Sequence, residues 1–259
     1  MAFLQCSYFS KVLQINSSMN VILPDRDYDN PPAMLYLLHG LNGDHTTWMR
    51  RTCIERYAHS RNVAVFMPAV NRSFYSTMAH GPDYWKFISE ELPQIIKQLF
   101  RLDEAEHDAF VLGNSMGGYG AFKFGLNFPG RFKAVASLAG SLDLINIGHA
   151  FKDDPDLQVE LDTVFNRHIS SLTHTESDLV HLLKTYPTDA ATRFYQYCGT
   201  EDYLYEFDQH FKKKAEAAGL NLTYLESEGD HSWNCWEPRI ESILDWFDIE
   251  KVKEEIIEE

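Results

Sequence analysis

The sequence predicts an α/β fold in which a mostly parallel central sheet is flanked by helices. Short runs rich in β-branched and aromatic residues recur along the chain, and segments with helical periodicity separate them. Six runs carry this prediction: 34–38, 63–67, 109–112, 134–138, 194–198 and 222–226. Two earlier runs, 6–10 and 19–23, are separated by turn-prone residues. They are expected to form an antiparallel beginning of the same sheet.

Helical periodicity is clearest over residues 83–100, where apolar residues recur at spacings of three and four. One face of this helix should pack on the sheet. Pro93 lies inside the segment and has no backbone N–H to donate, so we expect a kink or break near Leu92. A similar apolar spacing over residues 232–247 predicts a final helix that packs back on the sheet.

Residues 143–190 have a different texture, with short apolar groups, many charges and no strand-like run. They predict a helical cap inserted after a central strand, where it can roof an active site and select substrates. A peripheral pair of helices remote from any site is an equal alternative. We expect residues 1–259 to form a single domain, because this length is within the size of one hydrophobic core.

The composition excludes several classes of protein. Thirty-eight acidic residues against 23 basic ones leave a formal net charge of -15, which would repel a nucleic acid backbone and an anionic membrane surface. No apolar run approaches the roughly 20 residues needed to cross a bilayer. We therefore expect neither nucleic acid nor a membrane as a partner, while assembly into a homo-oligomer stays open.

The cysteines and the N-terminus bear on metal sites and location. The four cysteines lie far apart without a C-x-x-C pair, and the motif H-E-x-x-H is absent, so no metal is expected. The N-terminal residues mix apolar and polar side chains and do not form a signal-peptide pattern. These features predict a cytoplasmic protein with free thiols.

One motif indicates nucleophilic chemistry. Residues 113–117 read Gly-Asn-Ser-Met-Gly, directly after the apolar run 109–112 and before a helix-competent stretch. This is G-x-S-x-G at a strand-to-helix junction, where larger residues flanking the serine would collide with the neighbouring strand and helix. The turn would expose the Ser115 hydroxyl at a helix N-terminus, whose N–H groups favour negative charge. A glycine-rich turn with an idle serine is the alternative.

A serine hydroxyl is a weak nucleophile, so Ser115 requires a histidine base and a carboxylate that orients this base. In hydrolases with this motif the acid and then the histidine follow the serine along the chain. His231 lies in a loop after the late run 222–226, where loops gather at the carboxyl edge of the sheet. Four other histidines within 143–190, together with His210, are interpreted as surface or packing residues. His39 precedes the serine and is expected to form structural hydrogen bonds.

The candidate acid is Asp202, in the loop after the run 194–198 and therefore one strand before His231. From there its carboxylate can accept a hydrogen bond from the distal ring nitrogen and stabilise the imidazolium. Glu201 and Asp208 are its rivals. An extended loop would point Glu201 the opposite way, and Asp208 falls on the expected helix beyond.

Acyl transfer also needs hydrogen-bond donors directed at the oxyanion of the tetrahedral intermediate. One donor should be the backbone N–H of Met116, the residue after the nucleophile, and the other should come from a loop after an early strand. Residues 35–43 end such a strand in a turn bracketed by Gly40 and Gly43. The Leu41 N–H is therefore the second candidate.

With these residues in place, the chain resembles the short-chain carboxylesterases of the esterase D type, and among them the tributyrin esterases of Gram-positive bacteria. The resembling segments span most of the chain: L-Y-L-L-H-G-L-N-G at 35–43, W-M-R-R-T at 48–52, E-E-L-P at 90–93, G-N-S-M-G-G-Y-G at 113–120, C-G-T-E-D-Y-L-Y at 198–205 and H-S-W at 231–233.

The resemblance implies an α/β-hydrolase fold, a triad of Ser115, Asp202 and His231, and an oxyanion hole at Leu41 and Met116. It also implies no cofactor, and the hydrolysis of short acyl esters, from acetyl to butyryl and tributyrin-like. S-formylglutathione hydrolases and acetylxylan or feruloyl esterases share these features and are the alternatives. The 143–190 segment matches least, and it is expected to decide the substrate.

Overall fold

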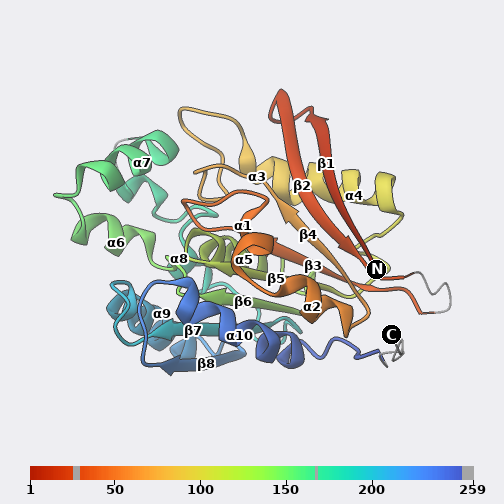
Figure 1. The fold of residues 1–259 in the computed structure, drawn as a ribbon. Helices are drawn as coiled ribbons and strands as arrows, with labels where there is room; N and C mark the ends of the chain where they lie inside the picture. The colour runs from red at the N-terminus through yellow and green to blue at the C-terminus, as the bar shows by residue number, and fades with distance from the viewer. Residues whose placement is uncertain (26–29, 167–168, 253–259) are drawn as a thin grey trace.

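The computed structural model describes residues 1–25, 30–166 and 169–252. Its centre is an eight-stranded sheet with strand order β1-β2-β4-β3-β5-β6-β7-β8 (Figure 1). Strands β1 and β2 pair antiparallel, β2 joins β4 antiparallel, and all later pairings are parallel. The strands are Ala2–Ser10, Ile15–Leu23, Ala33–Leu38, Val63–Pro68, Ala109–Asn114, Ala134–Leu138, Arg193–Gly199 and Leu222–Ser227. All eight predicted runs are strands, and the predicted α/β-hydrolase fold is confirmed.

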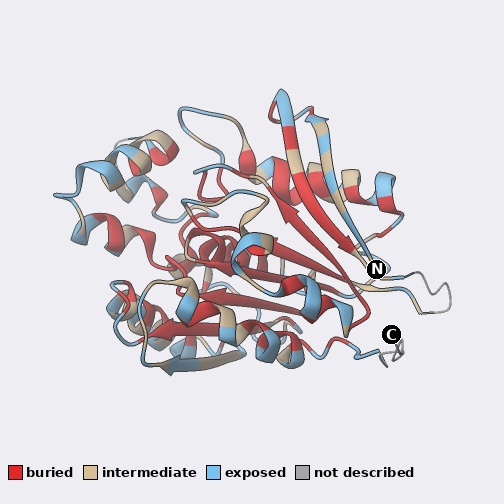
Figure 2. Cartoon of the chain, in the orientation of Figure 1, coloured by how far each residue is buried: buried red, intermediate tan, exposed pale blue. Residues whose placement is uncertain are grey.

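The inner strands are buried on both faces, as Figure 2 shows in red along the middle of the sheet. Successive side chains of a strand point to opposite faces. In β3, Met34 and Tyr36 accordingly join one apolar cluster, while Leu35 and Leu37 join another. Because a parallel strand covered on both sides has no polar face, these segments appear in the sequence as continuous apolar runs.

Helices from different parts of the chain cover each face. The first cluster includes side chains of α4 (Leu92–Phe100), α5 (Met116–Asn127) and α9 (Tyr205–Ala217). The second includes α2 (Ile54–His59) and α10 (Trp233–Trp246), which is the predicted final helix. Among the described residues, no helix is long and apolar enough to span a membrane.

The segment 83–100 changes helical register where Pro93 was expected to interrupt it. It begins as α3 (Tyr84–Lys86), continues as a π-helix over Phe87–Glu91, and becomes α4 at Leu92. The Leu92 N–H donates to the Phe87 carbonyl, which is the i-to-i−5 bond of a π-helix. Pro93 follows the π-helix directly and has no N–H to donate, and the Ser89 carbonyl four residues before it accepts from Arg131 Nη2 (2.9 Å) instead.

The segment between β6 and β7 is helical, as predicted for 143–190. It contains α6 (Leu144–Ala150), α7 (Pro155–Phe165), a 3₁₀ turn (Ile169–Leu172) and α8 (Leu179–Leu182). The side chain of Asp154 caps α7 by accepting from two backbone N–H groups of its first turn. In Figure 1, α6 and α7 project beyond one end of the sheet, on the side where β5 leads into α5.

A buried lysine lies within α5. The Lys123 Nζ donates to the Tyr75 carbonyl (3.1 Å), to Ser76 Oγ (3.0 Å) and to Ser177 Oγ (2.8 Å). It also lies 4.4 Å from the ring centroid of Trp85. Burial disfavours the charged ammonium and lowers the pKa of Lys123 to about 7. This one side chain therefore joins α5, the 75–76 loop and the segment that precedes α8.

The lowered pKa of Lys123 makes the protein's stability depend on pH. Glu176 and Asp83 raise this pKa, but burial outweighs them and leaves it below the ordinary value of 10.5. Between about pH 7 and 10.5 the unfolded chain binds more protons at this site, so stability should rise with pH over that window. Relative to a Lys123→Met variant, the wild type should thus gain free energy of unfolding from about pH 6.5 to about pH 9.5. Urea unfolding of both proteins measures this, and a difference independent of pH would contradict it.

Candidate active site

The site is built around a strained turn between β5 and α5. Ser115 has backbone angles φ 54° and ψ −119°, a region that non-glycine residues rarely adopt. Its N–H donates to the Leu138 carbonyl at the end of β6 (2.8 Å), which holds the turn against the sheet. Met116 begins α5 directly after it, so the Ser115 hydroxyl lies at the N-terminus of a 12-residue helix.

The glycines on either side of Ser115 allow backbone segments to approach very closely. A Cβ on Gly113 would lie 2.1 Å from the Gly117 carbonyl oxygen, and a Cβ on Gly117 would lie 2.0 Å from the Leu38 carbonyl oxygen. Both obstacles are backbone atoms, which cannot rotate aside. The collisions expected from the G-x-S-x-G motif are therefore present in the folded chain.

A Gly117→Ala variant should lose this turn. Because the added methyl group meets the Leu38 carbonyl, α5 must move away from β3, and we expect the melting temperature to fall by about 10 °C or more. Covalent labelling of Ser115 by a fluorophosphonate should be lost with it. Gly81→Ala is the matched control, since its Cβ would meet only the flexible Met78 side chain. Wild-type melting and labelling in Gly117→Ala would contradict the steric argument.

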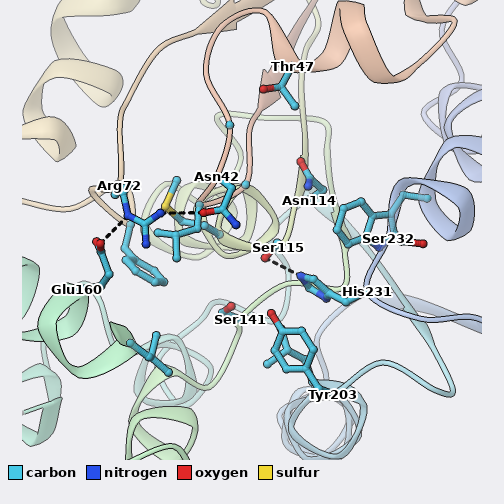
Figure 3. A pocket seen from close by; sticks show the side chains of 18 of the residues that line it. Asn42, Thr47, Arg72, Asn114, Ser115, Ser141, Glu160, Tyr203, His231 and Ser232 are labelled. Atoms are coloured by element: carbon cyan, nitrogen blue, oxygen red, sulfur yellow. Dashed lines mark hydrogen bonds and ion pairs between the residues drawn. The ribbon is translucent and has the colours of Figure 1, made fainter. Parts of the chain in front are cut away.

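Three predicted side chains meet at the carboxyl end of the sheet, and Figure 3 shows two of them, Ser115 and His231, joined by a dashed line. Ser115 Oγ lies 2.9 Å from His231 Nε2, and His231 Nδ1 lies 2.7 Å from Asp202 Oδ2. The other oxygen of Asp202 accepts from the Leu204 N–H (2.8 Å), and its side chain is fully buried. Since a carboxylate can only accept, Nδ1 carries the ring hydrogen, and Nε2 is left to accept from the serine.

The rival acids occupy different positions. Glu201 is exposed, and Asp208 is buried on α9, where burial raises its pKa to about 7. Among the described residues, the carboxylate that contacts His231 belongs to Asp202. Of the other histidines that follow Ser115, His168 lies outside the described residues, and the remaining four do not line the cavity described below: His149, His174, His181 and His210.

Two aromatic rings pack on the His231 imidazole. Trp236 meets it edge to face at a centroid distance of 4.8 Å, and Tyr203 lies 4.6 Å from it at a tilt of 49°. Together they restrict rotation of the imidazole away from Ser115. Sequence reasoning missed this role. The helical spacing that includes Trp236 indicated only core packing, and Tyr203 was noted only as part of the 198–205 segment that contains Asp202.

The two expected oxyanion donors are adjacent to the nucleophile. A Cβ added to Gly40 would lie 3.4 Å from Ser115 Cβ, so the turn that carries Leu41 passes beside the serine. The Gly43 N–H closes this turn on the Gly40 carbonyl (2.9 Å). Within the described part of the chain, the N–H groups of Leu41 and Met116 have no hydrogen-bond acceptor, and both residues line the cavity.

His39 holds the beginning of the turn over residues 40–43 through hydrogen bonds of its ring. Its Nε2 accepts from the Val70 N–H (3.1 Å), and its Nδ1 lies 2.8 Å from the Gly40 carbonyl oxygen. The Tyr75 hydroxyl donates to the His39 carbonyl (2.9 Å). Burial lowers the pKa of His39, which keeps the ring neutral as this bonding requires. The expected structural role of His39 is confirmed.

Ser115 and His231 open into a cavity of about 1060 Å³ with two unlike walls. Helices α6 and α7 of the inserted segment supply most of the apolar wall, which consists of Phe74, Leu144, Ile147, Phe151, Leu157 and Leu161. The polar wall includes Asn42, Thr47, Arg50, Arg51, Arg72 and Asn234. The aromatic side chains of Phe74 and Trp233 also line the cavity, whereas the neighbouring Tyr75 is fully buried and does not.

Acyl transfer requires a serine hydrogen-bonded to a histidine, a carboxylate that orients the histidine, and N–H donors for the oxyanion. The site contains each of these groups. Within the described ranges, no cluster of three or more His, Cys, Asp or Glu residues could hold a metal ion. The fold and the site thus define a class of protein, the serine hydrolases of the α/β-hydrolase fold.

The family follows from comparison with known proteins. Residues 10–247 match the family model named Esterase and described as "Putative esterase", so the chain belongs to this esterase family. It is 28% identical to an acetyl esterase of Caldicellulosiruptor saccharolyticus over 95% of this chain and 98% of that protein.

Two solved structures from Staphylococcus aureus are similar over nearly their whole length. A fluorophosphonate-binding serine hydrolase has a TM-score of 0.85 and 29% identity, covering 96% of this chain and 99% of that one. An S-formylglutathione hydrolase has a TM-score of 0.82 and 30% identity, covering 95% and 98%. This protein is therefore a serine hydrolase that acts on carboxylic ester bonds.

Proposed function

We propose that this esterase hydrolyses short-chain acyl esters, from acetyl to butyryl and tributyrin-like, through a covalent acyl-enzyme on Ser115. The observation that carries the proposal is a pair of consecutive hydrogen bonds, from Ser115 Oγ to His231 (2.9 Å) and from His231 to the buried Asp202 (2.7 Å). In this arrangement Ser115 is the nucleophile, His231 is the base and Asp202 is the carboxylate that orients the base. We retain the esterase D type as the proposed subfamily.

In the first step Ser115 Oγ attacks the ester carbonyl while His231 Nε2 takes its proton. The tetrahedral intermediate collapses as His231 returns this proton to the departing alcohol, and the acyl group stays on Ser115. Water then attacks the acyl-enzyme while His231 Nε2 takes its proton, and the carboxylic acid leaves as His231 returns this proton to Ser115 Oγ. Asp202 stabilises the imidazolium in both steps, and neither step needs a cofactor or a metal.

The N–H groups of Leu41 and Met116 are proposed to bind the oxyanion. Each is a backbone donor without a competing acceptor in the described residues, and each lies beside Ser115. Such preorganised donors stabilise the charge that develops in the transition state, and removing one typically raises the barrier by about 3 kcal/mol. The Leu41 side chain is free to shape the cavity.

A shallow apolar wall favours short acyl groups. Four of the six residues of the apolar wall, Phe74, Leu144, Ile147 and Leu161, are at most 4% exposed, and the other two, Phe151 and Leu157, are half-buried. They offer little apolar area for a long alkyl chain to cover, and each buried methylene group contributes only about 0.8 kcal/mol. The similarity to an acetyl esterase supports the same preference.

Ser115→Ala should abolish hydrolysis of p-nitrophenyl butyrate, with kcat falling by about 10⁴-fold or more, because the acyl group then has no covalent acceptor. The hydroxyl lies at the cavity surface and supports no other contact in the core, so the melting temperature should stay near that of the wild type. A folded Ser115→Ala protein with wild-type kcat would refute the assignment.

A panel of p-nitrophenyl esters tests the chain-length preference. The specificity constant kcat/KM should be highest for acetate and butyrate and fall by about tenfold or more for decanoate, since the wall is too small to cover a long chain. Because the leaving group is the same throughout, differences in kcat/KM report the acyl side. A decanoate value equal to the butyrate value would contradict the short-chain proposal.

Thioester hydrolysis is the second candidate. Arg50 and Arg51 lie on the polar wall, where they could meet carboxylates of a glutathione-like leaving group. The 30% identity to an S-formylglutathione hydrolase favours it as well. Adding S-formylglutathione and acetylated xylose to the panel separates these substrates. The alternative of feruloyl ester hydrolysis is supported only by a similarity of fold, to a ferulic acid esterase with 20% sequence identity.

Two further features complete the proposal. The cysteines of the chain are free thiols, and Cys198 and Cys235 are buried, which suits the reducing cytoplasm that we propose as the location. The proposed partner is the small ester itself, with no nucleic acid or membrane, and assembly into a homo-oligomer stays open.

A further inference from the structure

One arginine joins the inserted segment to the turn that carries Leu41. The Arg72 Nη1 donates to Asn42 Oδ1 (2.8 Å), and the Arg72 Nε donates to Glu160 Oε1 on α7 (2.6 Å), as the dashed lines in Figure 3 show. Asn42 and Glu160 are 118 positions apart in the chain, and all three residues line the cavity. A planar guanidinium can hold two acceptors at once in a defined geometry.

The loop that carries Arg72 is itself rigidly held. Ser73, Phe74, Tyr75 and Ser76, which follow Arg72, are at most 3% exposed. Phe74 and Tyr75 have positive φ angles of 48° and 51°, which the surrounding contacts must hold in place. The Tyr75 side chain and main chain are both hydrogen-bonded, as described above. Arg72 therefore extends toward Asn42 from a fixed base.

Few hydrogen bonds hold the outer half of the turn that receives Arg72, although the Leu41 side chain packs against the apolar core. Its one internal backbone hydrogen bond joins Gly43 to Gly40, and His39 anchors only the beginning of the turn. Asn42 is exposed, and within the described residues its side chain accepts a hydrogen bond from Arg72. Rotation of the turn about its two ends would redirect the Leu41 N–H away from the oxyanion.

We infer that Arg72 is a positioning residue for ester hydrolysis: it holds Asn42, and thereby the Leu41 N–H, in the orientation that stabilises the oxyanion, while Glu160 on α7 holds Arg72. The inference rests on the proposed function of Ser115 and Leu41. In this arrangement the inserted segment contributes to the chemical step as well as to the cavity wall.

The burial of the pair indicates that its effect is local. The side chains of Arg72 and Glu160 are 45% and 21% exposed, and ion pairs this accessible to water add little to global stability. Loss of Arg72 should accordingly change the melting temperature by no more than about 2 °C. A catalytic effect without a stability effect separates positioning from a general structural role.

The principal test is the kinetics of Arg72→Met with p-nitrophenyl butyrate. Removing an oxyanion donor outright typically costs about 10²–10³ in kcat, so a misdirected donor should cost about tenfold, with KM within about twofold of the wild type. Inactivation by a fluorophosphonate should slow by a similar factor, since its tetrahedral adduct uses the same donors. Arg72→Lys should resemble Arg72→Met, because one ammonium cannot replace the two-pronged guanidinium.

Two further variants test the route through the structure. Asn42→Ala should lower kcat about as much as Arg72→Met, and the double variant should be no more than about twofold slower than either single variant, because both remove the same link. Glu160→Gln should give a smaller loss of kcat, since it weakens only the support of Arg72. Independent, multiplying losses in the double variant would overturn the inference.

Arg101→Met is the matched control, since it removes an exposed arginine that does not line the cavity and should leave kcat unchanged. An Arg72→Met variant with wild-type kcat would overturn the inference, as would a change confined to KM, which would make Arg72 a substrate-binding residue. Failure of the proposed function is distinguishable, because it requires activity in Ser115→Ala, whereas failure of this inference leaves Ser115→Ala inactive and Arg72→Met fully active.

Discussion

The active site depends on the close approach of the α5 backbone to β3. At Gly117 there is no room for a Cβ, which would lie 2.0 Å from the Leu38 carbonyl oxygen. This approach places the first turn of α5 directly against the strand that leads into the Gly40 turn. It also brings Leu41 and Met116, whose N–H groups are the proposed oxyanion donors, to the same cavity beside Ser115. The strained backbone of Ser115 is a consequence, since the chain must reverse between β5 and α5 within one residue.

The parallel sheet then brings distant residues to this point. The strands β3, β5, β7 and β8 all end at the same edge, and each is followed by a loop that contributes one part of the site: Leu41, Ser115, Asp202 and His231. Strand order places β7 next to β8, so the acid and the histidine come from neighbouring loops and meet at 2.7 Å. The architecture therefore needs no long side chain to connect the acid to the nucleophile, because the strand order already places Asp202, His231 and Ser115 within hydrogen-bond reach of one another in turn.

The sequence predicted the strands and the triad candidates because each depends on a local pattern. A buried parallel strand appears as a short apolar run. The five residues of G-x-S-x-G contain the two glycines that the tight turn requires, because a larger residue at either position would collide with neighbouring backbone. The tie from Arg72 to Asn42 and Glu160 could not be predicted, because it joins three exposed or half-buried polar residues whose meeting depends on how α7 packs. The same holds for Tyr203 on His231 and for Lys123 beneath the 75–76 loop. The spacing of residues along the sequence predicts local structure, but it does not predict contacts between loops that are distant in the chain.

The catalytic residues and the residues of the cavity wall are held in place by different kinds of contact. The turn at Ser115, the His39 hydrogen bonds and the buried carboxylate of Asp202 are constrained by backbone contacts and burial, which few substitutions can relax without unfolding the region. The wall of the cavity comes instead from short helices rich in charge, α6 and α7, joined to the remainder partly by exposed ion pairs. Substitutions there can change the shape of the cavity at small cost in stability. The chemistry of an ester hydrolase is thus built into the sheet and the first turn of α5, whereas we propose that the choice of ester depends on the inserted segment, where α6 and α7 line the cavity. That division explains why the sequence motifs identify the reaction more sharply than the substrate.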